Sequence, residues 1–453
     1  MNQLFRRCVA GCVAVGLTAS GAAVAQERSA DRPPASVFFA NVRVFDGKSD
    51  KLTEATHVLV VANRISKVGK SVTAPAGARE IDGGGRVLMP GLIDAHWHTM
   101  LCANTLADVM NPDMSYLTLN AAAEAQRTLM RGFTAVRDVG GPAFGLKRAI
   151  DEGVAAGPRI YPSGPTISQT SGHADFRRRD ERPRRFGGGI PAAESSGLGI
   201  LADGVDEMLT AVRENLRLGA SQIKIHGGGG VSSTYDPLDV KQYLPEEMRA
   251  AVQAASDWGT YVAVHLYNVE GIRRALDAGV MSIEHGHLID DPTMKLLADK
   301  GAWLSTQPFT EDSLPRFPDE ERKLKAKAII EGTDRVYRLA KKHKVKLAWG
   351  TDLVFNPAAT NRQNANITKL ARWFTPAEAL RMVTHDNAEL LALSGKRNPY
   401  PGKLGVVEEG ALADLLLVDG DPLKDLSILE TPDRTLVVIM KNGVIYKNGL
   451  PSR

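Results

Sequence analysis

Short apolar segments alternate with helical patterns through the middle of this 453-residue chain, and this alternation limits the fold more than any other feature. A repeated strand–helix order is typical of parallel sheets, because each parallel strand needs a crossover helix. Eight such units predict an α/β fold in which the strands close into a (β/α)8 (TIM) barrel. The expected strands are Val87–Met89 running on to His98, Thr134–Asp138, Arg159–Ser163, Gln222–His226, Tyr261–Leu266, Ser282–His285, Trp303–Thr306 and Lys346–Asp352.

Helix-start signals between these segments support the pattern. Asp203 precedes a run with helical apolar spacing and is placed to cap it. Pro245 opens a second helix with two acidic residues in its first turn. Residues 375–378 read Thr-Pro-Ala-Glu, a capping box that opens a third.

The two ends of the chain have a different character, with short β-like runs separated by turn residues. They cover residues 36–88 and 401–453, and Asn442-Gly443 is a strong hairpin turn. We expect both ends to meet in one small β-sandwich module, with the barrel occupying residues 89–400.

Residues 1–25 resemble a secretory signal peptide. Arg6 and Arg7 precede an apolar run too short to span a bilayer, and Ala23-Val24-Ala25 is a small-residue cleavage site. We expect cleavage after Ala25, a linker over residues 26–35, and a periplasmic or secreted protein. A lipoprotein signal ending at Cys12 is an alternative, but the apolar run continues well past that residue.

Composition excludes some partners. The net charge of +4 gives no case for nucleic acid or an acidic membrane as the main partner. Of the three cysteines, two lie in the expected signal segment, so only Cys102 remains and no intrachain disulfide is expected in the mature chain.

Residues able to bind metal or move protons recur at the ends of the expected strands, which is where barrel enzymes place their chemistry. The first strand ends in His96-Trp97-His98, and histidines two apart on a strand point to the same side. Four further strands end in residues of this kind. They supply Lys224 and His226, then His265, then His285 with His287, and finally Asp352.

These residues carry a resemblance to the amidohydrolase superfamily. It rests on PGLIDAHWH (residues 90–98), the lysine of the fourth strand, the histidines of the fifth and sixth, and Gly-Thr-Asp at residues 350–352. The motifs SGHAD (171–175), ADGVDEM (202–208), QIKIHGGGGVSS (222–233) and SIEHGHLID (282–290) are similar to the prolidase and ochratoxinase-like group, which includes Xaa-Pro dipeptidases. The resemblance covers nearly all of the expected mature chain.

The resemblance implies two divalent metal ions, usually Zn²⁺. His96, His98 and Asp352 would hold one ion, and His265 with His285 the other. Lys224 would bridge both as N6-carboxylysine. Carbamylation makes chemical sense because a lysine ammonium has no lone pair for a metal, whereas a carbamate is a two-oxygen ligand.

The implied activity is hydrolysis of an amide or peptide bond to a C-terminal amino acid, in a dipeptide, an N-acyl amino acid or an ochratoxin-like amide. A metal-bridging hydroxide would attack the carbonyl, and Asp352 would act as general base and then general acid. A cyclic-amide hydrolase or an imidazolonepropionase-like enzyme on the same scaffold is the alternative. A catalytically inactive paralogue is a remote one, because all six ligand positions are filled.

Three further residues are candidate substrate contacts: His173 after the third strand, Tyr235 after the glycine run, and His287. Six arginines between residues 177 and 185 form either a solvated loop or a lid that attracts anionic substrates. The expected partner is therefore a small amide with a free carboxylate. We also expect a homo-oligomer, as in relatives of the group.

Overall fold

The computed structural model describes residues 36–233, 235–313, 317 and 319–451. The expected signal segment 1–25 and the expected linker 26–35 lie outside the described residues. The described residues, from Ser36 onward, form one compact unit. Within the described residues, no helix combines the length and apolar character needed to cross a bilayer.

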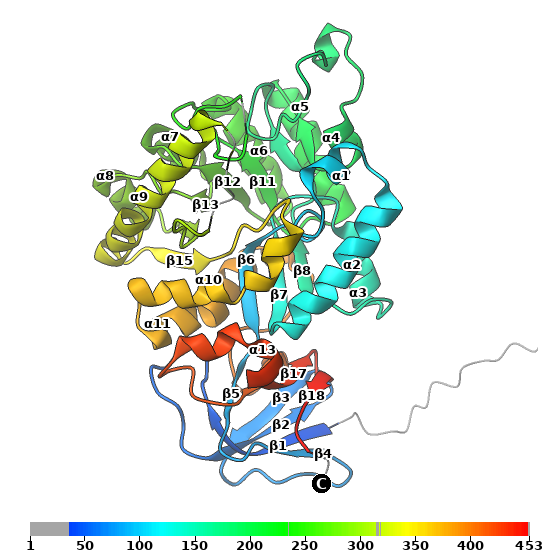
Figure 1. The fold of residues 1–453 in the computed structure, drawn as a ribbon, viewed down its shortest axis with the longest axis vertical. Helices are drawn as coiled ribbons and strands as arrows, with labels where there is room; N and C mark the ends of the chain where they lie inside the picture. Colours follow the sequence, from blue (N-terminus) through cyan, green and yellow to red (C-terminus); the bar gives the residue numbers. More distant parts are fainter. Residues whose placement is uncertain (1–35, 234, 314–316, 318, 452–453) are drawn as a thin grey trace, which may run out of the picture. The chain divides into compact units, whose positions relative to one another are not determined.

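Parallel strands form the centre of this unit (Figure 1). β6 pairs with β7 and β7 with β8, and β11 to β15 pair in chain order, always in parallel. Two backbone hydrogen bonds close the circle: Ser221 N–H to Pro162 O (2.7 Å) beside β8 and β11, and Asp352 N–H to His96 O (2.9 Å) beside β15 and β6. In the described part of the chain the barrel strands are β6 (Leu92–Trp97), β7 (Phe133–Asp138), β8 (Arg159–Pro162), β11 (Ile223–His226), β12 (Val262–Leu266), β13 (Ser282–His285), β14 (Trp303–Thr306) and β15 (Lys346–Trp349).

These strands confirm the predicted (β/α)8 barrel, with one change at the first. The run from Val87 to His98 forms two strands rather than one, with Gly91 between β5 in the sandwich and β6 in the barrel. A Cβ at Gly91 would lie 2.1 Å from Oγ1 of Thr134, so only glycine fits there. Two short strands, β9 (Thr166–Ser168) and β10 (Gly199–Leu201), extend the sheet beside β11.

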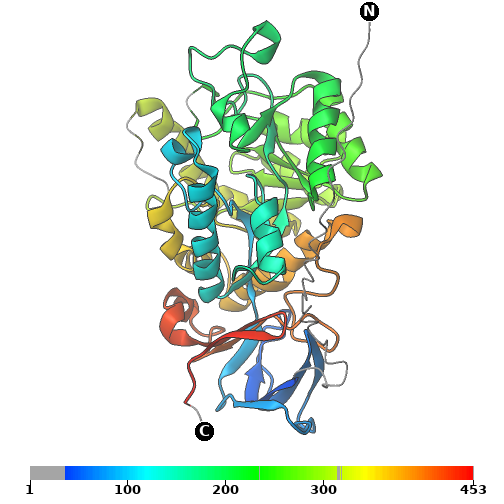
Figure 2. The same ribbon diagram turned by 90° about the vertical axis from the view of Figure 1, so that its right-hand side faces the viewer.

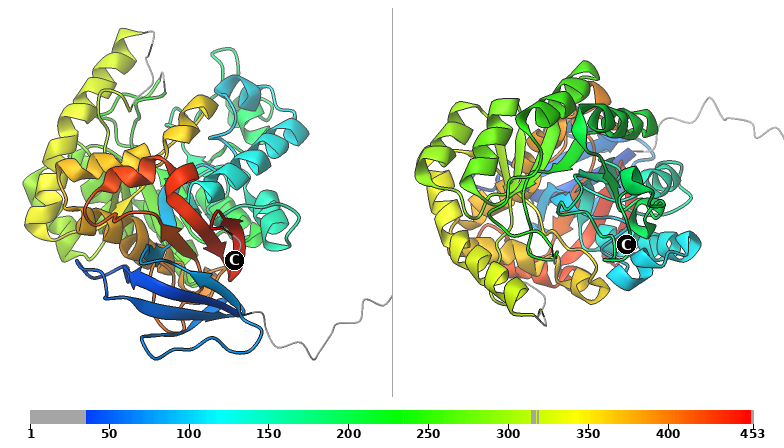
Figure 3. Two further views of the ribbon diagram at one scale, coloured as in Figure 1. Left: turned by 60° about the horizontal axis from the view of Figure 1, so that its bottom comes forward. Right: turned by 90° about the horizontal axis from the view of Figure 1, so that it is seen from above.

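Helices surround the strands, as the view from above shows (Figure 3, right). The second and third predicted helix starts are confirmed, at Pro245 and at the Thr375 capping box. The first helix also starts where expected, but the Asp203 side chain does not cap it, because its carboxylate accepts hydrogen bonds from Thr170 instead. The longer helices are α2 (Met114–Met130), α3 (Phe144–Asp151), α5 (Gly204–Leu218), α6 (Pro245–Asp257), α7 (Val269–Ala278), α8 (Asp291–Asp299) and α9 (Glu320–His343). The shorter ones are α1 (Leu106–Met110), α4 (Ala192–Ser195), α10 (Ala365–Thr368), α11 (Pro376–Arg381), α12 (Asn387–Ala392) and α13 (Pro432–Thr435).

The β-rich ends of the chain meet in a sandwich, as predicted. The strand order is β18-β17-β16-β5-β1-β2-β3, with β4 also pairing with β1, so β5 joins the N-terminal strands to the C-terminal ones. Figures 1 and 2 show the blue strands beside the red ones. Asn442 and Gly443 both have positive φ, 55° and 75°, which matches the predicted hairpin turn. The strands are β1 (Ser36–Val44), β2 (Thr56–Val61), β3 (Arg64–Gly69), β4 (Arg79–Asp82), β5 (Val87–Pro90), β16 (Leu415–Val418), β17 (Leu436–Lys441) and β18 (Val444–Asn448).

Candidate active site

The barrel brings four predicted site residues together around one carboxylate. Asp352 Oδ1 lies 3.3 Å from Nε2 of His96 and 3.4 Å from Nε2 of His98, and Asp352 Oδ2 lies 3.9 Å from Nδ1 of His285. His96, His285 and Asp352 each offer a ligand atom within 4.8 Å of the others. We call His96, His98, His285 and Asp352 the carboxylate cluster.

Backbone strain helps to aim two members of this cluster. His285 and Asp352 have φ values of 75° and 54°, a left-handed conformation that non-glycine residues rarely adopt. Such residues persist where the surrounding structure enforces them, often at functional sites. The left-handed backbone at His285 changes where its side chain points. Glu284 and His285 are adjacent on β13, and yet both side chains reach the barrel interior.

Each imidazole of the carboxylate cluster is oriented through its Nδ1 atom. Nδ1 of His96 donates to Glu284 Oε2 (2.8 Å), Nδ1 of His98 to Gly140 O (3.1 Å), and Nδ1 of His285 to Gln307 Oε1 (2.8 Å). These bonds leave the Nε2 lone pairs available. Metal-binding histidines usually have this arrangement, because a partner on one ring nitrogen fixes the tautomer of the other.

A buried ion pair stands behind His96. Arg137 is fully buried, and its Nη2 atom donates to both oxygens of Glu284 at 2.7 Å. The same guanidinium donates to Ala95 O (2.6 Å) and to the hydroxyl of Ser282 (3.2 Å). Burial alone would raise the pKa of Glu284, but Arg137 and His96 outweigh it and hold the pKa well below its usual value. Glu284 is therefore a carboxylate that orients His96.

Lys224 is buried on β11 without a hydrogen-bond or ion-pair partner among the described residues. Burial lowers the pKa of its amine to about 8, although Glu284 and Asp352 act to raise it. With that pKa about a tenth of the amine is neutral at pH 7, far more than for an ordinary lysine, and a neutral amine is the form that reacts with carbon dioxide.

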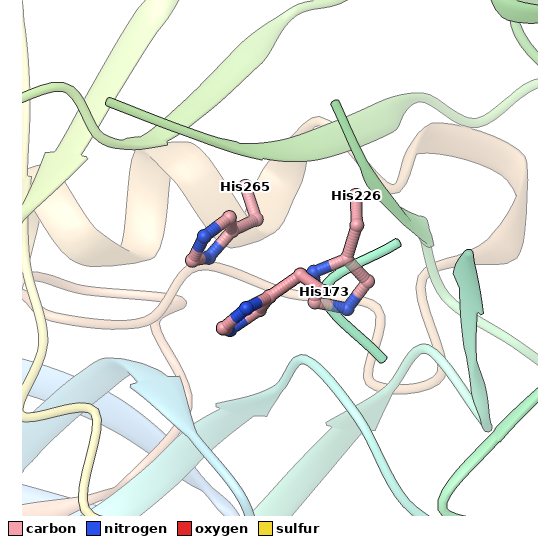
Figure 4. A group of neighbouring side chains, drawn as sticks. All are labelled: His173, His226 and His265. Atoms are coloured by element: carbon pink, nitrogen blue, oxygen red, sulfur yellow. The ribbon is translucent and has the colours of Figure 1, made fainter. Parts of the chain in front are cut away.

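A second group of side chains contains imidazoles alone. His173, His226 and His265 each offer a ring nitrogen within 4.8 Å of the others. We call these three residues the imidazole cluster. Figure 4 shows the rings of His173 and His265 nearly parallel, with His226 facing them from β11. His265 lies between the two clusters, with its ring centroid 4.2 Å from that of His173 and 4.4 Å from that of His285.

The other predicted substrate contacts lie in different surroundings. His287 is fully buried, donates through Nε2 to Gln307 O (3.0 Å) and stacks on Phe309. Burial lowers its pKa to about 4. Tyr235 is 51% exposed with its ring beneath the guanidinium of Arg179, so the structure does not bring it to either cluster.

The arginine-rich segment 177–185 is largely neutralised by its own neighbours. Arg177 pairs with Asp175, Arg178 with Asp180 and Glu181, Arg184 with Glu194, and Arg185 with Glu207. Arg179 and Arg182 have no carboxylate partner in the described part of the chain. Within this segment, these two arginines therefore keep a positive charge that no described carboxylate offsets.

Four buried residues near the clusters were not assigned a role from the sequence. They are Arg137, Glu284, Asp236 and Gln307, each of which holds a site histidine or its partner. A signal existed for the first two, because a charged residue inside an apolar strand is expensive to bury unless it is paired.

Comparison with known proteins agrees with this architecture. The Amidohydrolase family model matches residues 87–446. Ochratoxinase of Aspergillus niger is 30% identical over 376 residues, which cover 80% of this chain and 76% of that protein.

Solved structures give the same result. The crystal structure of an amidohydrolase superposes with a TM-score of 0.84 at 36% identity, covering 92% of this chain and 100% of the other. A prolidase complexed with N-methylphosphonate-L-proline has a TM-score of 0.84 at 31% identity, covering 91% and 100%. The chain therefore belongs to the amidohydrolase family, and within that family it is similar to prolidases and ochratoxinase.

Proposed function

We propose that this protein is a metal-dependent hydrolase that cleaves the amide bond between an acyl group and a C-terminal amino acid. The observation that carries the proposal is the carboxylate cluster, in which three imidazoles held through Nδ1 surround the carboxylate of Asp352. The names of the prolidase and ochratoxinase relatives support amide bonds to a C-terminal residue as the substrate class.

The donor set of the site suits divalent metal ions. Neutral imidazole nitrogen and carboxylate oxygen are preferred ligands of Zn²⁺. His96, His98 and Asp352 would hold one ion, and His265 with His285 the other. Bound ions would polarise the scissile carbonyl and make a water molecule acidic near neutral pH.

Lys224 fits a bridging role if its neutral amine adds to carbon dioxide. The nitrogen forms a bond to carbon, one proton is released, and the product is a carbamate with two donor oxygens. Burial favours this step because it lowers the pKa of the amine to about 8. Protein prepared with ¹³C-bicarbonate should give a carbamate signal in a ¹³C spectrum, and the signal should be missing from Lys224→Ala.

Asp352 is placed to move the proton. Burial raises its pKa, but His96 and His98 outweigh burial and hold the pKa well below its usual value, so the carboxylate is ionised. It can accept a proton from the attacking water and pass it to the departing amine. His173, at the rim of the imidazole cluster, is the candidate contact for the substrate carbonyl or carboxylate.

The test is hydrolysis of a matched pair, N-acyl-phenylalanine and its C-terminal amide, before and after treatment with a chelator. A carboxylate held by charge-assisted hydrogen bonds contributes about 1.5–3 kcal/mol. The acid should therefore be cleaved about 10- to 150-fold more efficiently than the amide. Equal rates for the acid and the amide would favour a cyclic-amide hydrolase or a general amidase instead. Activity unaffected by the chelator would contradict the metal dependence.

A further inference from the structure

The imidazole cluster has the composition and spacing of a metal site in its own right. Its three ring nitrogens lie within 4.8 Å of one another. Zinc binds imidazole nitrogen at about 2.0–2.1 Å, so tetrahedral neighbours lie about 3.4 Å apart. The rings therefore need to close by little more than an ångström to share one ion.

His226 is the strongest sign that this group binds something. Both of its ring nitrogens are buried and neither has a hydrogen-bond partner among the described residues. The other histidines of the two clusters each engage one ring nitrogen with the protein. A buried polar group without a partner is unfavourable, and a metal ion would use its lone pair.

His173 is held in the way that metal-binding histidines usually are. Its Nδ1 atom lies 3.0 Å from Oδ2 of Asp236, a side chain that is 1% exposed, and 2.8 Å from the hydroxyl of Ser233. The same Asp236 oxygen accepts from the backbone N–H of Gly230 (2.9 Å). A carboxylate behind an imidazole fixes its tautomer and strengthens the other nitrogen as a ligand.

His265 has only one ring nitrogen left for a metal. Its Nε2 atom donates to Gly229 O at 3.2 Å, which leaves Nδ1 unprotonated. In the proposed function this residue also serves the lysine-bridged pair of ions, so an ion in the imidazole cluster competes with that pair for the same nitrogen.

We propose that His173, His226 and His265 form a separate binding site for a borderline transition-metal ion such as Zn²⁺, and that filling it inhibits the enzyme. Three neutral imidazoles suit Zn²⁺, Co²⁺, Ni²⁺ or Cu²⁺ and do not suit Mg²⁺ or Ca²⁺. An ion there would use His265, which the proposed function assigns to a catalytic ion, and would cover His173, the candidate substrate contact. Binding is independent of the proposed function, whereas inhibition rests on it.

The binding test uses full-length, metal-free protein titrated with Zn²⁺ in a Lys224→Ala background, where no lysine bridge can form. We expect one ion at the carboxylate cluster and a second, weaker ion at the imidazole cluster. Adding His226→Leu should lower the affinity for the second ion by about 100-fold or more. Loss of a residue that only hydrogen-bonds to a metal ligand already lowers affinity about 10- to 100-fold, and His226 would be a ligand itself. His343→Gln, outside both clusters, is the matched control.

Two further measurements keep the test decisive if His226→Leu is hard to interpret. Metal-free His226→Leu should be at least as heat-stable as the parent, because the change removes two unpartnered nitrogens, and it should gain less stability from Zn²⁺. Asp236→Asn leaves all three ligands in place and should weaken the second ion by about 10- to 100-fold. Unchanged Zn²⁺ binding in both variants would overturn the site.

The inhibition test separates this inference from the proposed function. Excess Zn²⁺ should inhibit hydrolysis of N-acyl-phenylalanine by the parent enzyme, and His226→Leu should shift the inhibition to much higher Zn²⁺. The same inhibition in both would overturn the inhibitory role. If no acyl amino acid is hydrolysed while the second ion still binds and depends on His226, the function fails and the metal site stands.

Discussion

The two histidine clusters share the barrel interior and differ in charge. Asp352 faces His96 and His98 within the carboxylate cluster, and Glu284 lies directly behind His96. Among the described residues the imidazole cluster includes no carboxylate, and Asp236 contacts one of its three rings, that of His173.

This difference separates the pKa of His96 from the pKa values of His226 and His265. Burial lowers the pKa of His96, but Asp352 and Glu284 outweigh it, so the pKa is raised. Burial and the neighbouring imidazoles instead push the pKa values of His226 and His265 well below the usual value. The pKa of His285 is lowered as well although it belongs to the carboxylate cluster, because burial, His96 and Lys224 outweigh the effect of Asp352. The carboxylate of Asp352 can thus attract a cation by charge, whereas His226 and His265 offer neutral ring nitrogens.

Removing the central carboxylate should have the largest effect on this comparison. Asp352→Asn keeps the shape of the side chain but loses the charge and the proton acceptor. Loss of a general base is worth about 10²–10⁴ in kcat, and weaker metal binding adds to it. The measurement is kcat with metal content determined on the same sample. Near-normal kcat with both ions bound would mean that another residue is the base.

Removing the carboxylate behind His96 should mainly reduce stability. Glu284→Gln leaves the fully buried guanidinium of Arg137 without a counter-charge, and breaking a buried pair in this way costs about 3–5 kcal/mol. Urea unfolding of the metal-free protein measures it. Ser282→Ala is the matched control, since that hydroxyl bonds both members of the pair but has no charge. Equal losses in the two variants would show that charge pairing is unimportant there.

The buried imidazole of His287 should make the free energy of unfolding decrease at low pH. His287 has a pKa of about 4 in the fold, against about 6.5 when unfolded. Because the pKa of His287 is lower in the folded state, protonation at low pH favours the unfolded state. The free energy of unfolding should therefore be highest above pH 6.5 and fall by roughly 3 kcal/mol as the pH drops toward 4. His287→Gln should make the unfolding free energy of metal-free protein depend less on pH over this range. Equal slopes for His287→Gln and the parent would contradict the assignment.

The smallest effect is expected outside both clusters, at the two arginines without carboxylate partners. Replacing Arg179 and Arg182 with Gln should lower kcat/KM for an N-acyl amino acid about two- to fivefold at low salt, and high salt should remove the difference. The pair Arg148→Gln and Arg217→Gln, exposed on α3 and α5, is the control. A loss that persists at high salt would indicate direct contact with the substrate rather than steering.

The barrel and the cluster residues at its strand ends were predictable because both depend on short-range patterns. An apolar run followed by His, Lys or Asp marks a strand and its functional end, and the period of two placed Lys224 and His226 on one side of β11. The same rule would put Glu284 and His285 on opposite faces. The left-handed backbone at His285 makes it an exception to this alternation, and no local sequence pattern predicts that conformation.

Loop residues were predicted less well because loops follow no period. Tyr235 follows the glycine run closely in sequence, yet it lies half exposed beneath Arg179. The partners of the arginine-rich segment include Glu194 and Glu207, which come later in the chain. Such pairing depends on tertiary packing, which a reading of neighbouring residues does not capture.

The position of β5 between β1 and β16 has a consequence for the order in which the protein folds. One edge of β5 has its partner as soon as the N-terminal strands exist, but the other edge waits for a strand made near the end of synthesis. An open apolar strand edge is prone to pair with other chains. Contacts between distant parts of a chain also form slowly. During synthesis the barrel strands are therefore made while the sandwich is half complete, and a chain that stops before β16 would keep that edge exposed to aggregation and proteolysis.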